Sequence, residues 1–560
     1  MESHRQNKRR ANAAVEEAED RLSALPDDLL HCILRDVPLK YAVRTSVLSR
    51  RWPRLWLRAL ATSPVLDFSD RDFARGQPPA QAVATVRRCL RRHARRGAPL
   101  DAFRVAFRSP AGGFRWDVVA WVATALARGA RDVAVDLTPT RWRKAVDDDW
   151  GLMNVDESAF LELPADLFRA PNSLERLTLV RCSLRAVPFG APGLAGLRSL
   201  SLSHVDVFGE DLRDILLKTC PSLEFLSLRS CNDLFHVRVF GDKLRGLELL
   251  GCHGVLDFWF IVPALESFVF HGDITYFDGD SLVVNFGATP ALRDAYLSVI
   301  GFVYTYTDPE YYEAHCFAYY SLLTCVAHAT ILTICSVGLQ SLLHLLRNPQ
   351  IDETLAFGID LPNLQELQLL MPSLCDDDVD RIGGFFEFTR PPILDRLFIR
   401  VNLLIIPCYH DFHVRNKRTF STHKTSFCML NLQFSGGKAS RASGSGVATV
   451  MAGQDEDDAE IASSSDLVFD HLKFIKVVNF RGTRCEVRLL EFLAGRAPSL
   501  EQLVLVTVEC EGVLGDEQMK IVQGRVMAMQ TASPVFRVVV CRPREDGSQN
   551  PVHKRFYHEE

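Results

Sequence analysis

The chain contains 560 residues, of which 47% are hydrophobic and 24% charged, and it carries a formal net charge of −5 at pH 7. This length predicts two to four structural units of an ordinary soluble globular protein, and the charge gives no reason to expect general nucleic-acid binding. Fifteen cysteines without a paired C-x-x-C spacing favour reduced thiols in the cytosol or nucleus.

Residues 1–20 are expected to form a disordered tail, because they are polar and lack the apolar core of a signal peptide. The run Lys8-Arg9-Arg10 is interpreted as part of this solvated tail, with a nuclear localisation signal as the alternative. The most apolar stretch, 319–346, is interrupted by polar residues and is too polar for a membrane span. A buried helix followed by a strand is predicted there.

Residues 22–56 are the most informative part of the chain. Pro26 fits the first turn of a helix, and Asp27 and Asp28 suit the positive end of the helix dipole. Pro38 ends this helix, and two further short helices follow. Apolar residues recur at helical spacing in all three: they are Leu29, Leu30, Ile33 and Leu34, then Val43, Val47 and Leu48, and then Trp52, Leu55 and Trp56.

Three helices of this length cannot bury so much apolar surface among themselves, so the excess must contact a partner or the rest of the chain. Residues 21–62 closely resemble an F-box, the adaptor-docking module of SCF-type ubiquitin ligases. The ending Ser49-Arg50-Arg51-Trp52 with Leu55-Trp56 is typical of plant F-box proteins with leucine-rich repeats. Pro53 departs from the pattern and is expected to shorten the third helix at its start. A helical hairpin that caps an unrelated domain is the alternative.

The resemblance implies that this segment binds a Skp-type adaptor, which in turn carries the cullin and RING subunits. Some residues of the matching set must instead pack the segment's own core, and the sequence does not apportion them. The residues implied in adaptor binding are Leu25, Pro26, Leu29, Ile33, Pro38, Val43, Val47, Trp52, Leu55 and Trp56.

Residues 63–140 are predicted to contain a linker and a first βαβ unit. A helix over 83–96 carries six arginines beside its apolar face. We interpret them as a solvated face rather than a phosphate-binding surface, because no aromatic platform or Gly-rich loop accompanies them. A strand over 99–107, a helix over 116–127 and a strand over 131–137 indicate a right-handed βαβ unit in a parallel sheet.

A repeated pattern, Leu-x-x-Leu-x-Leu, characterises residues 141–434. Successive clear copies are 21 to 26 residues apart, which fits leucine-rich repeats. The second and third leucines point into the core of a curved solenoid, and one repeat alone cannot bury them. The copies start at Leu174, Leu197, Leu223, Leu244 and Leu265, with looser ones at Leu292, Leu364 and Leu394 and a late one at Leu500.

The residue between these two leucines points outward onto the concave face, where we expect a protein substrate to bind. Cys182, Cys231 and Cys252 each follow the last leucine of a repeat by three residues. We interpret them as turn residues packed between coils rather than as metal ligands. The candidate substrate-binding residues are Arg176, Thr178, Ser199, Ser201, Ser203, Phe225, Ser227, Arg229 and Glu248.

The composition changes over residues 435–465, which are rich in Gly, Ser and acidic residues and are predicted to be a disordered loop. Ser463-Ser464-Ser465 is interpreted as part of this serine-rich linker, with phosphorylation as the alternative. Residues 466–545 contain a strand, a Phe-x-Gly turn, a helix and an Ala-Pro-x-Leu-Glu strand start, and this order resembles the FBD domain of plant F-box proteins. Residues 546–560 are expected to be a tail.

Nothing in the sequence indicates a catalytic site, a cofactor or a metal. The acidic run 376–380 resembles the start of a calcium loop, but Arg381 stands where the sharp turn needs glycine. We therefore interpret the run as the opening of a helix. His410 and His413 supply only two possible ligands, which do not make a metal site.

The predicted fold class is α/β, with a three-helix F-box, a curved leucine-rich-repeat solenoid with parallel strands and an FBD-like strand–helix–strand unit. The resemblance implies a substrate-recognition subunit of an SCF-type ubiquitin ligase in the nucleus or cytoplasm. It would bind a Skp-type adaptor and an unknown protein substrate, with no nucleic-acid or membrane partner. Two alternatives remain: a receptor in which a small ligand completes the substrate site, and a repeat scaffold that acts outside ubiquitination.

Overall fold

The chain divides into two compact units: unit 1 comprises residues 1–205 and 218–223, and unit 2 comprises residues 206–217 and 224–560. Several predicted features, including Pro38, the loop 435–465 and the histidines near 410, lie outside the residues that the structure describes. The computed structural model describes residues 25–37, 39–69, 78–106, 113–138, 161–188, 190–205, 219–231, 234–274, 284–299, 309–347, 358–401, 467–508, 523–527, 529, 531–534 and 536–557.

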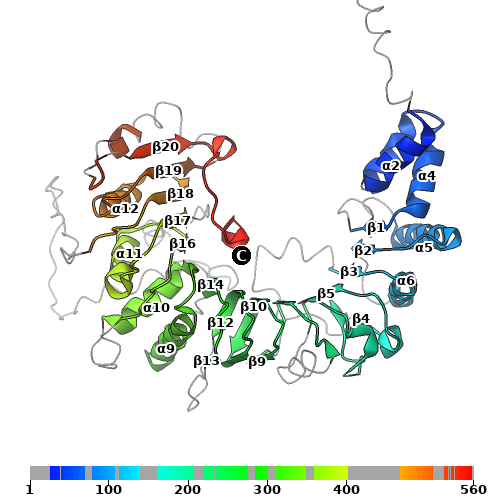
Figure 1. Ribbon diagram of the computed structural model, residues 1–560, viewed down its shortest axis with the longest axis horizontal. Helices are drawn as coiled ribbons and strands as arrows, with labels where there is room; N and C mark the ends of the chain where they lie inside the picture. Colours follow the sequence, from blue (N-terminus) through cyan, green and yellow to red (C-terminus); the bar gives the residue numbers. More distant parts are fainter. Residues whose placement is uncertain are drawn as a thin grey trace, which may run out of the picture. The chain divides into compact units, whose positions relative to one another are not determined.

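Unit 1 begins with the three predicted helices (Figure 1). Contrary to expectation, Pro53 does not delay the third helix, because a proline in the first turn removes an N–H that would have no helical partner. The helices are α2 (Asp27–Asp36), α3 (Leu39–Arg44) and α4 (Trp52–Thr62), with the 3-10 turn η1 (Thr45–Val47) between α3 and α4.

The rest of unit 1 alternates parallel strands with helices or short turns, as the βαβ and repeat patterns predict. The strands of the main sheet lie in the order β1-β2-β3-β5-β7. The arginine-rich helix ends at Gly97, whose φ of 70° closes the helix in the left-handed conformation that glycine adopts without strain. The elements are β1 (Val65–Phe68), α5 (Pro79–Arg96), β2 (Ala102–Ala106), α6 (Arg115–Ala127), β3 (Asp132–Asp136), β4 (Leu161–Glu162), η4 (Ala165–Phe168), β5 (Arg176–Val180), β6 (Cys182–Ser183), η5 (Pro192–Leu194) and β7 (Ser199–Ser203).

The described part of unit 2 contains a parallel sheet in the order β8-β10-β12-β14-β15-β16-β17-β18-β19-β20 and a smaller sheet of β9, β11 and β13. Figure 1 shows α9 to α12 along one side of the main sheet and the C-terminal segment on the other. The strands are β8 (Phe225–Arg229), β9 (His236–Phe240), β10 (Gly246–Val255), β11 (Asp257–Ile261), β12 (Ser267–Ile274), β13 (Val284–Phe286), β14 (Asp294–Val299), β15 (Ile331–Cys335), β16 (Glu366–Met371), β17 (Arg396–Val401), β18 (Phe474–Phe480), β19 (Gln502–Thr507) and β20 (Arg537–Cys541). The helices are α9 (Pro309–Val326), α10 (Ser336–Leu346), α11 (Asp376–Thr389) and α12 (Arg484–Ala494), followed by the short turns η11 (Pro543–Glu545) and η12 (Lys554–Tyr557). This architecture confirms the predicted fold class.

The apolar stretch 319–346 forms a helix, a strand and a second helix, whereas the sequence predicted only a helix followed by a strand. The last part becomes α10, whose first turn is capped by the Cys335 sulfur accepting from the Gly338 amide at 3.5 Å. Gly338 has no side chain to collide with Tyr319 of α9, whose hydroxyl would lie 2.3 Å from an added Cβ. Periodicity alone does not separate a buried helix from a buried strand.

The cysteines identified in the sequence each follow a residue in the left-handed conformation. Arg181, Ser230 and Gly251 have φ values of 59°, 46° and 57°. The next residues, Cys182, Cys231 and Cys252, are at most 1% exposed, so they are buried as predicted. They are not all turn residues, because Cys182 begins β6 and Cys252 lies at an irregularity within β10. Burial raises the pKa of Cys252 to about 12, although backbone hydrogen bonds at Cys231 and Leu250 lower it.

The strand–helix–strand unit near the C-terminus is stabilised by a capping box at the start of α12. The Thr483 hydroxyl accepts from the Glu486 amide at 3.3 Å, and Glu486 Oε2 accepts from the amides of Thr483 at 2.8 Å and Arg481 at 3.0 Å. This reciprocal bonding satisfies amides that a helix start leaves unpaired. Glu486 is 2% exposed, and burial raises the pKa of its carboxyl although these hydrogen bonds lower it.

Glu486→Ala is expected to lower the free energy of local opening around α12 by about 1–2 kcal/mol, because two backbone amides lose their acceptor. Hydrogen exchange at the amides of Arg481 and Thr483 measures this change. Glu491→Ala, at an exposed position of the same helix, is the matched control. Equal protection of these amides in both variants would contradict the role assigned to Glu486.

Candidate functional site

The F-box helices bury one side of α2 and leave the other side exposed. Leu30 and Leu34, one helical turn apart, are 0% and 3% exposed and pack with Trp52 and Leu55 of α4. Leu25 and Trp56 lie at the margin of this cluster and are partly buried. The structure thus assigns four of the ten implied adaptor-binding residues, Leu25, Trp52, Leu55 and Trp56, wholly or partly to the core.

The other described residues of that set remain open to solvent. Leu29 and Ile33 of α2 are 52% and 46% exposed, and Val43 and Val47 are 40% and 87% exposed. Pro26 is exposed as well. Exposed apolar side chains gathered on one small module are typical of an interaction surface.

Two further exposed apolar residues, which the implied set did not include, belong to the same module. Tyr41 is 53% exposed and Leu48 is 60% exposed. Leu48 could be identified in the sequence by its helical spacing. Tyr41 can be assigned to a helix only when the bounds of α3 are known.

Arg51 connects the two ends of the F-box. Its guanidinium donates to the Leu25 carbonyl at 2.8 Å and forms an ion pair with Asp27 at the start of α2. Trp56 donates from Nε1 to the Ser46 hydroxyl at 2.7 Å. The Ser-Arg-Arg-Trp ending therefore contributes to the internal frame that presents α2 and α3.

The F-box is joined to helix α5, which precedes the repeats, by a buried polar contact. His93 of α5 is 1% exposed, and its Nε2 lies 2.9 Å from the Ser63 carbonyl at the end of α4. Burial lowers the pKa of this imidazole, although the Ser63 carbonyl raises it, and Arg128 lowers it further. This contact holds α4 against α5 within unit 1. All six arginines of α5 are exposed, which agrees with a solvated face.

The candidate substrate residues of unit 1 lie on two neighbouring strands in register. Arg176 pairs with Ser199, Thr178 with Ser201, and Val180 with Ser203. Thr178 and Ser201 are partly exposed, and Arg176 is exposed with its Nε 3.4 Å from Asp132. Ser203, by contrast, is only 8% exposed.

The candidate residues of unit 2 pair in the same way on β8 and β10. Phe225 lies opposite Gly246, and Ser227 lies opposite Glu248. Ser227 is 6% exposed and donates to Glu248 Oε2 at 2.9 Å. The same carboxylate accepts from Arg555 at 2.8 Å, so Glu248 contacts a residue far along the chain. Arg229 is exposed at the end of β8.

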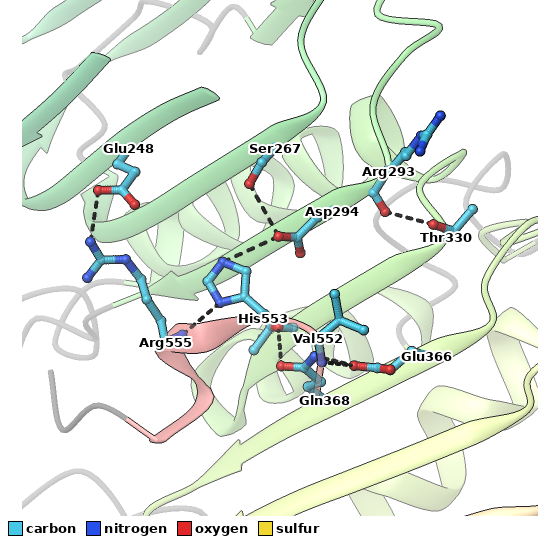
Figure 2. A network of polar contacts seen from close by, with 11 residues as sticks. Glu248, Ser267, Arg293, Asp294, Thr330, Glu366, Gln368, Val552, His553 and Arg555 are labelled. Atoms are coloured by element: carbon cyan, nitrogen blue, oxygen red, sulfur yellow. Dashed lines mark hydrogen bonds and ion pairs between the residues drawn. The ribbon is translucent and has the colours of Figure 1, made fainter. Parts of the chain in front are cut away.

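The structure shows that residues 546–557, which the sequence assigned to a tail, bind along the outward side of the unit 2 strands. Figure 2 shows the contacts of Val552, His553 and Arg555. Lys476 of β18 is 0% exposed and lies 2.6 Å from Asp546. It also donates to the Gln549 carbonyl and to Asn550 Oδ1, both at 3.1 Å. Burial tends to raise the pKa of Asp546, but the Lys476 and Ser548 hydrogen bonds outweigh burial and lower it.

The basic half of this segment meets acidic side chains (Figure 2). The Val552 amide donates to Glu366 Oε1 at 2.8 Å, and His553 Nε2 lies 3.5 Å from Asp294 Oδ2. The His553 ring stacks on Tyr296 with centroids 4.8 Å apart. Burial raises the pKa of Asp294 to about 7, while the Ser267 hydroxyl lowers it and the charge of Glu366 raises it further. No sequence signal marked this segment, because its hydrogen-bond partners on the strands lie between 73 and 307 residues away along the chain.

Among the described residues, no cluster of three or more His, Cys, Asp and Glu side chains is arranged to hold a metal ion. The acidic run at 376–378 opens α11, as predicted, and Asp378 accepts from the Cys375 amide at 3.1 Å and from Arg381 at 2.7 Å. None of the described helices combines the length and apolar character needed to cross a bilayer.

The raised pKa of Asp294 predicts a pH-dependent stability. Its carboxyl binds a proton in the folded state up to about pH 7 but in the unfolded state only up to its ordinary pKa of 3.8. The unfolding temperature should therefore fall as pH rises through this window and level off above it. Glu366 and His553 face the same carboxyl, so the difference between wild type and Asp294→Asn isolates its contribution.

Thermal unfolding between pH 4.5 and 8 should give a shallower curve for Asp294→Asn than for wild type. Asp470→Asn, at an exposed aspartate of the same unit, is the matched control. Parallel curves for wild type and Asp294→Asn would contradict the assignment.

Comparisons with known proteins identify two segments of the chain. Residues 22–59 match the F-box domain model, and residues 145–303 match a model of the leucine-rich repeats of an FBD-associated F-box protein. The FBD-associated F-box protein At5g38590 of Arabidopsis thaliana is 29% identical over 65% of this chain and 80% of its own length. Two F-box/FBD/LRR-repeat proteins of the same plant, At3g52680 and At2g04230, are each 31% identical, over 38% and 37% of this chain and 41% and 42% of their own lengths.

These matches agree with the helices of the F-box and with the stacked parallel strands that follow. The chain therefore joins an F-box domain to an FBD-associated leucine-rich-repeat region, and its homologues are F-box/FBD/LRR-repeat proteins of Arabidopsis.

Proposed function

We propose that this chain is the substrate-recognition subunit of an SCF-type ubiquitin ligase. The observation that carries the proposal is the exposed apolar set of the F-box, Leu29, Ile33, Val43 and Val47, on a module whose core is already filled. An F-box domain generally implies binding to a Skp-type adaptor. The cullin and RING subunits would join through that adaptor, in the nucleus or the cytoplasm.

The mechanism is positional rather than chemical. A substrate held by the repeats reacts with ubiquitin carried elsewhere in the same assembly, because tethering raises the effective concentration of the two groups. The contact between His93 and Ser63 supports this role, since it joins the F-box to α5, the helix that precedes the repeats, through a buried hydrogen bond. A flexible joint at this position would lower the effective concentration.

Protein substrates are proposed to bind the outward strand positions of the repeats, including Arg176, Thr178, Ser199 and Ser201 in unit 1. These side chains are exposed or partly exposed and differ in size and charge, which suits the recognition of a particular protein surface.

The described interior of the unit 2 repeats is filled by interlocking aromatic rings. Phe258 meets Phe270 with centroids 5.2 Å apart, and Phe260 meets Phe268 at 5.5 Å. A packed core of this kind counts against a small-ligand chamber among these rings, and so against the ligand-gated alternative at this place.

Leu29→Ala/Ile33→Ala is expected to weaken binding of the Skp-type adaptor by about 30-fold or more, because each side chain is an apolar anchor of about 1–2 kcal/mol. Both residues are exposed, so the double variant should keep the helical circular dichroism of wild type. Isothermal titration calorimetry with the full chain measures the affinity.

Arg54→Ala, at an exposed position of α4, is the control for the loss of an exposed side chain. Adaptor affinity that is unchanged in the double variant would remove the proposed docking face. A wild-type chain that does not bind the adaptor at all would favour the scaffold alternative.

Thr178→Arg/Ser201→Arg is expected to reduce substrate capture several-fold and to leave adaptor affinity unchanged, because two bulky charges would stand on the outward face of β5 and β7. Proximity labelling in plant cells, normalised to the F-box double variant, identifies captured proteins. Ala195→Arg, at an exposed position between the strands, is the control. An unaltered set of captured proteins would move the substrate face elsewhere.

A further inference from the structure

The outward positions of β12, β14, β15, β16, β17 and β18 in unit 2 are buried, although such positions normally remain open on the concave side of a repeat solenoid. The positions follow one another in register across the sheet. Their exposed fractions are Val269 2%, Tyr296 1%, Thr333 0%, Gln368 0%, Phe398 0% and Lys476 0%.

The corresponding row of unit 1 is not buried in this way. Arg104, Ala134, Thr178 and Ser201 occupy equivalent outward positions, and each is partly exposed. The repeat geometry itself therefore does not bury this row. In unit 2 the C-terminal segment 546–557 contacts the row directly.

The segment contacts the sheet as an extended peptide would, one strand after another. Asp546 forms an ion pair with Lys476 of β18, and the Val552 amide donates a hydrogen bond to Glu366 of β16. His553 then lies beside Asp294 of β14, and Arg555 donates a hydrogen bond to Glu248 of β10. Phe556, which is 0% exposed, packs edge-on against Phe398 with centroids 6.1 Å apart.

The charges of the face and the segment are complementary. At one end the buried ammonium of Lys476 pairs with the Asp546 carboxylate. Toward the other end, Glu366, Asp294 and Glu248 contact a backbone amide, an imidazole and a guanidinium of the segment, as Figure 2 shows. Arg396 also lies on this face, 3.2 Å from Glu366 Oε2. Asp294 Oδ1 is buried and has no hydrogen-bond partner among the described residues, so the segment leaves one acceptor of the face unused.

We propose that residues 546–557 are an internal ligand of this face, and that the partner which replaces them is an extended protein segment with a basic C-terminal half. The inference rests on the proposed function, because it names the substrate class that the repeats recognise. A partner that also donates to Asp294 Oδ1 would bind this face better than the internal segment does. The partner's arginine would occupy the place of Arg555 beside Glu248.

The test uses full-length chains and a fluorescein-labelled peptide with the sequence of residues 546–557. The wild-type chain should bind the peptide weakly, because its own segment competes at a high effective concentration. Arg555→Glu in the full chain places a second acid beside Glu248 and loosens the internal segment. This variant should bind the peptide at least 10-fold more tightly than wild type.

A charge exchange tests the register of binding. A peptide carrying Arg555→Glu should bind the Arg555→Glu chain at least 10-fold more weakly than the wild-type peptide does. A chain carrying Glu248→Arg should prefer the altered peptide to the wild-type peptide. A scrambled peptide of the same composition is the control for charge alone.

Hydrogen exchange at the Val552 amide reports whether the internal segment leaves the face. In the wild-type chain, saturating peptide should remove the protection of this amide. Persistent protection, or equal peptide affinity of the wild-type and Arg555→Glu chains, would overturn the proposal and make the segment a permanent part of the repeat fold. If Arg555→Glu prevents folding, His553→Ala takes its place in the same assay.

Adaptor affinity separates this inference from the proposed function. The variants lie in unit 2 and should bind the Skp-type adaptor as wild type does. Adaptor binding without the peptide effect would refute the inference alone. The peptide effect without adaptor binding would leave the recognition face in place and refute the ligase function.

Discussion

Each repeat buries the two strand residues that flank its outward position, and only the neighbouring repeats can cover them. In β10 these residues are Leu247 and Leu249, both 0% exposed, and Glu248 stands between them. Because side chains alternate along a strand, burying the pair turns the residue between them outward. The requirement for a stacked core thus creates, as a geometric consequence, a continuous row of side chains on the opposite face of the sheet.

The same requirement explains how the two ends of the repeat array differ. At the N-terminal end, the F-box is joined to α5, the helix that precedes the repeats, through the buried contact of His93 with Ser63. Its own small core takes up Leu30, Leu34, Trp52 and Leu55, and the module still leaves apolar side chains in water. A surface of this kind is stable as part of a complex because association removes the apolar area from water.

At the other end of the chain, the outward row of unit 2 is occupied by the protein's own C-terminal segment. A buried lysine such as Lys476 requires a paired charge, and Asp546 supplies it. Glu248 and Glu366 likewise receive donors from Arg555 and from the Val552 amide. The charges that make this face suitable for recognition are therefore satisfied within the chain, so an external ligand must offer an equivalent set of donors.

Local pattern determined much of this protein. The spacing of Leu29, Leu30, Ile33 and Leu34 predicts α2, and the Leu-x-x-Leu-x-Leu copies predict strands such as β5, β7, β8 and β10, because each element buries residues at its own period. The burial of the repeat cysteines and the acidic opening of α11 were also predictable, since they depend on neighbours a few residues away.

Other features were decided only by tertiary structure. The sequence of α2 contains two pairs of adjacent apolar residues, Leu29-Leu30 and Ile33-Leu34. Only the packing against α4 determines that Leu30 is buried while Leu29 is exposed. The close packing of α10 against α9 requires glycine at position 338, where an added Cβ would collide with Tyr319. The docking of residues 546–557 depends on charges contributed by strands as far away as β10. A short polar segment has no period of its own, so its place in the fold was set by partners that are distant in the sequence and adjacent only after the repeats have stacked.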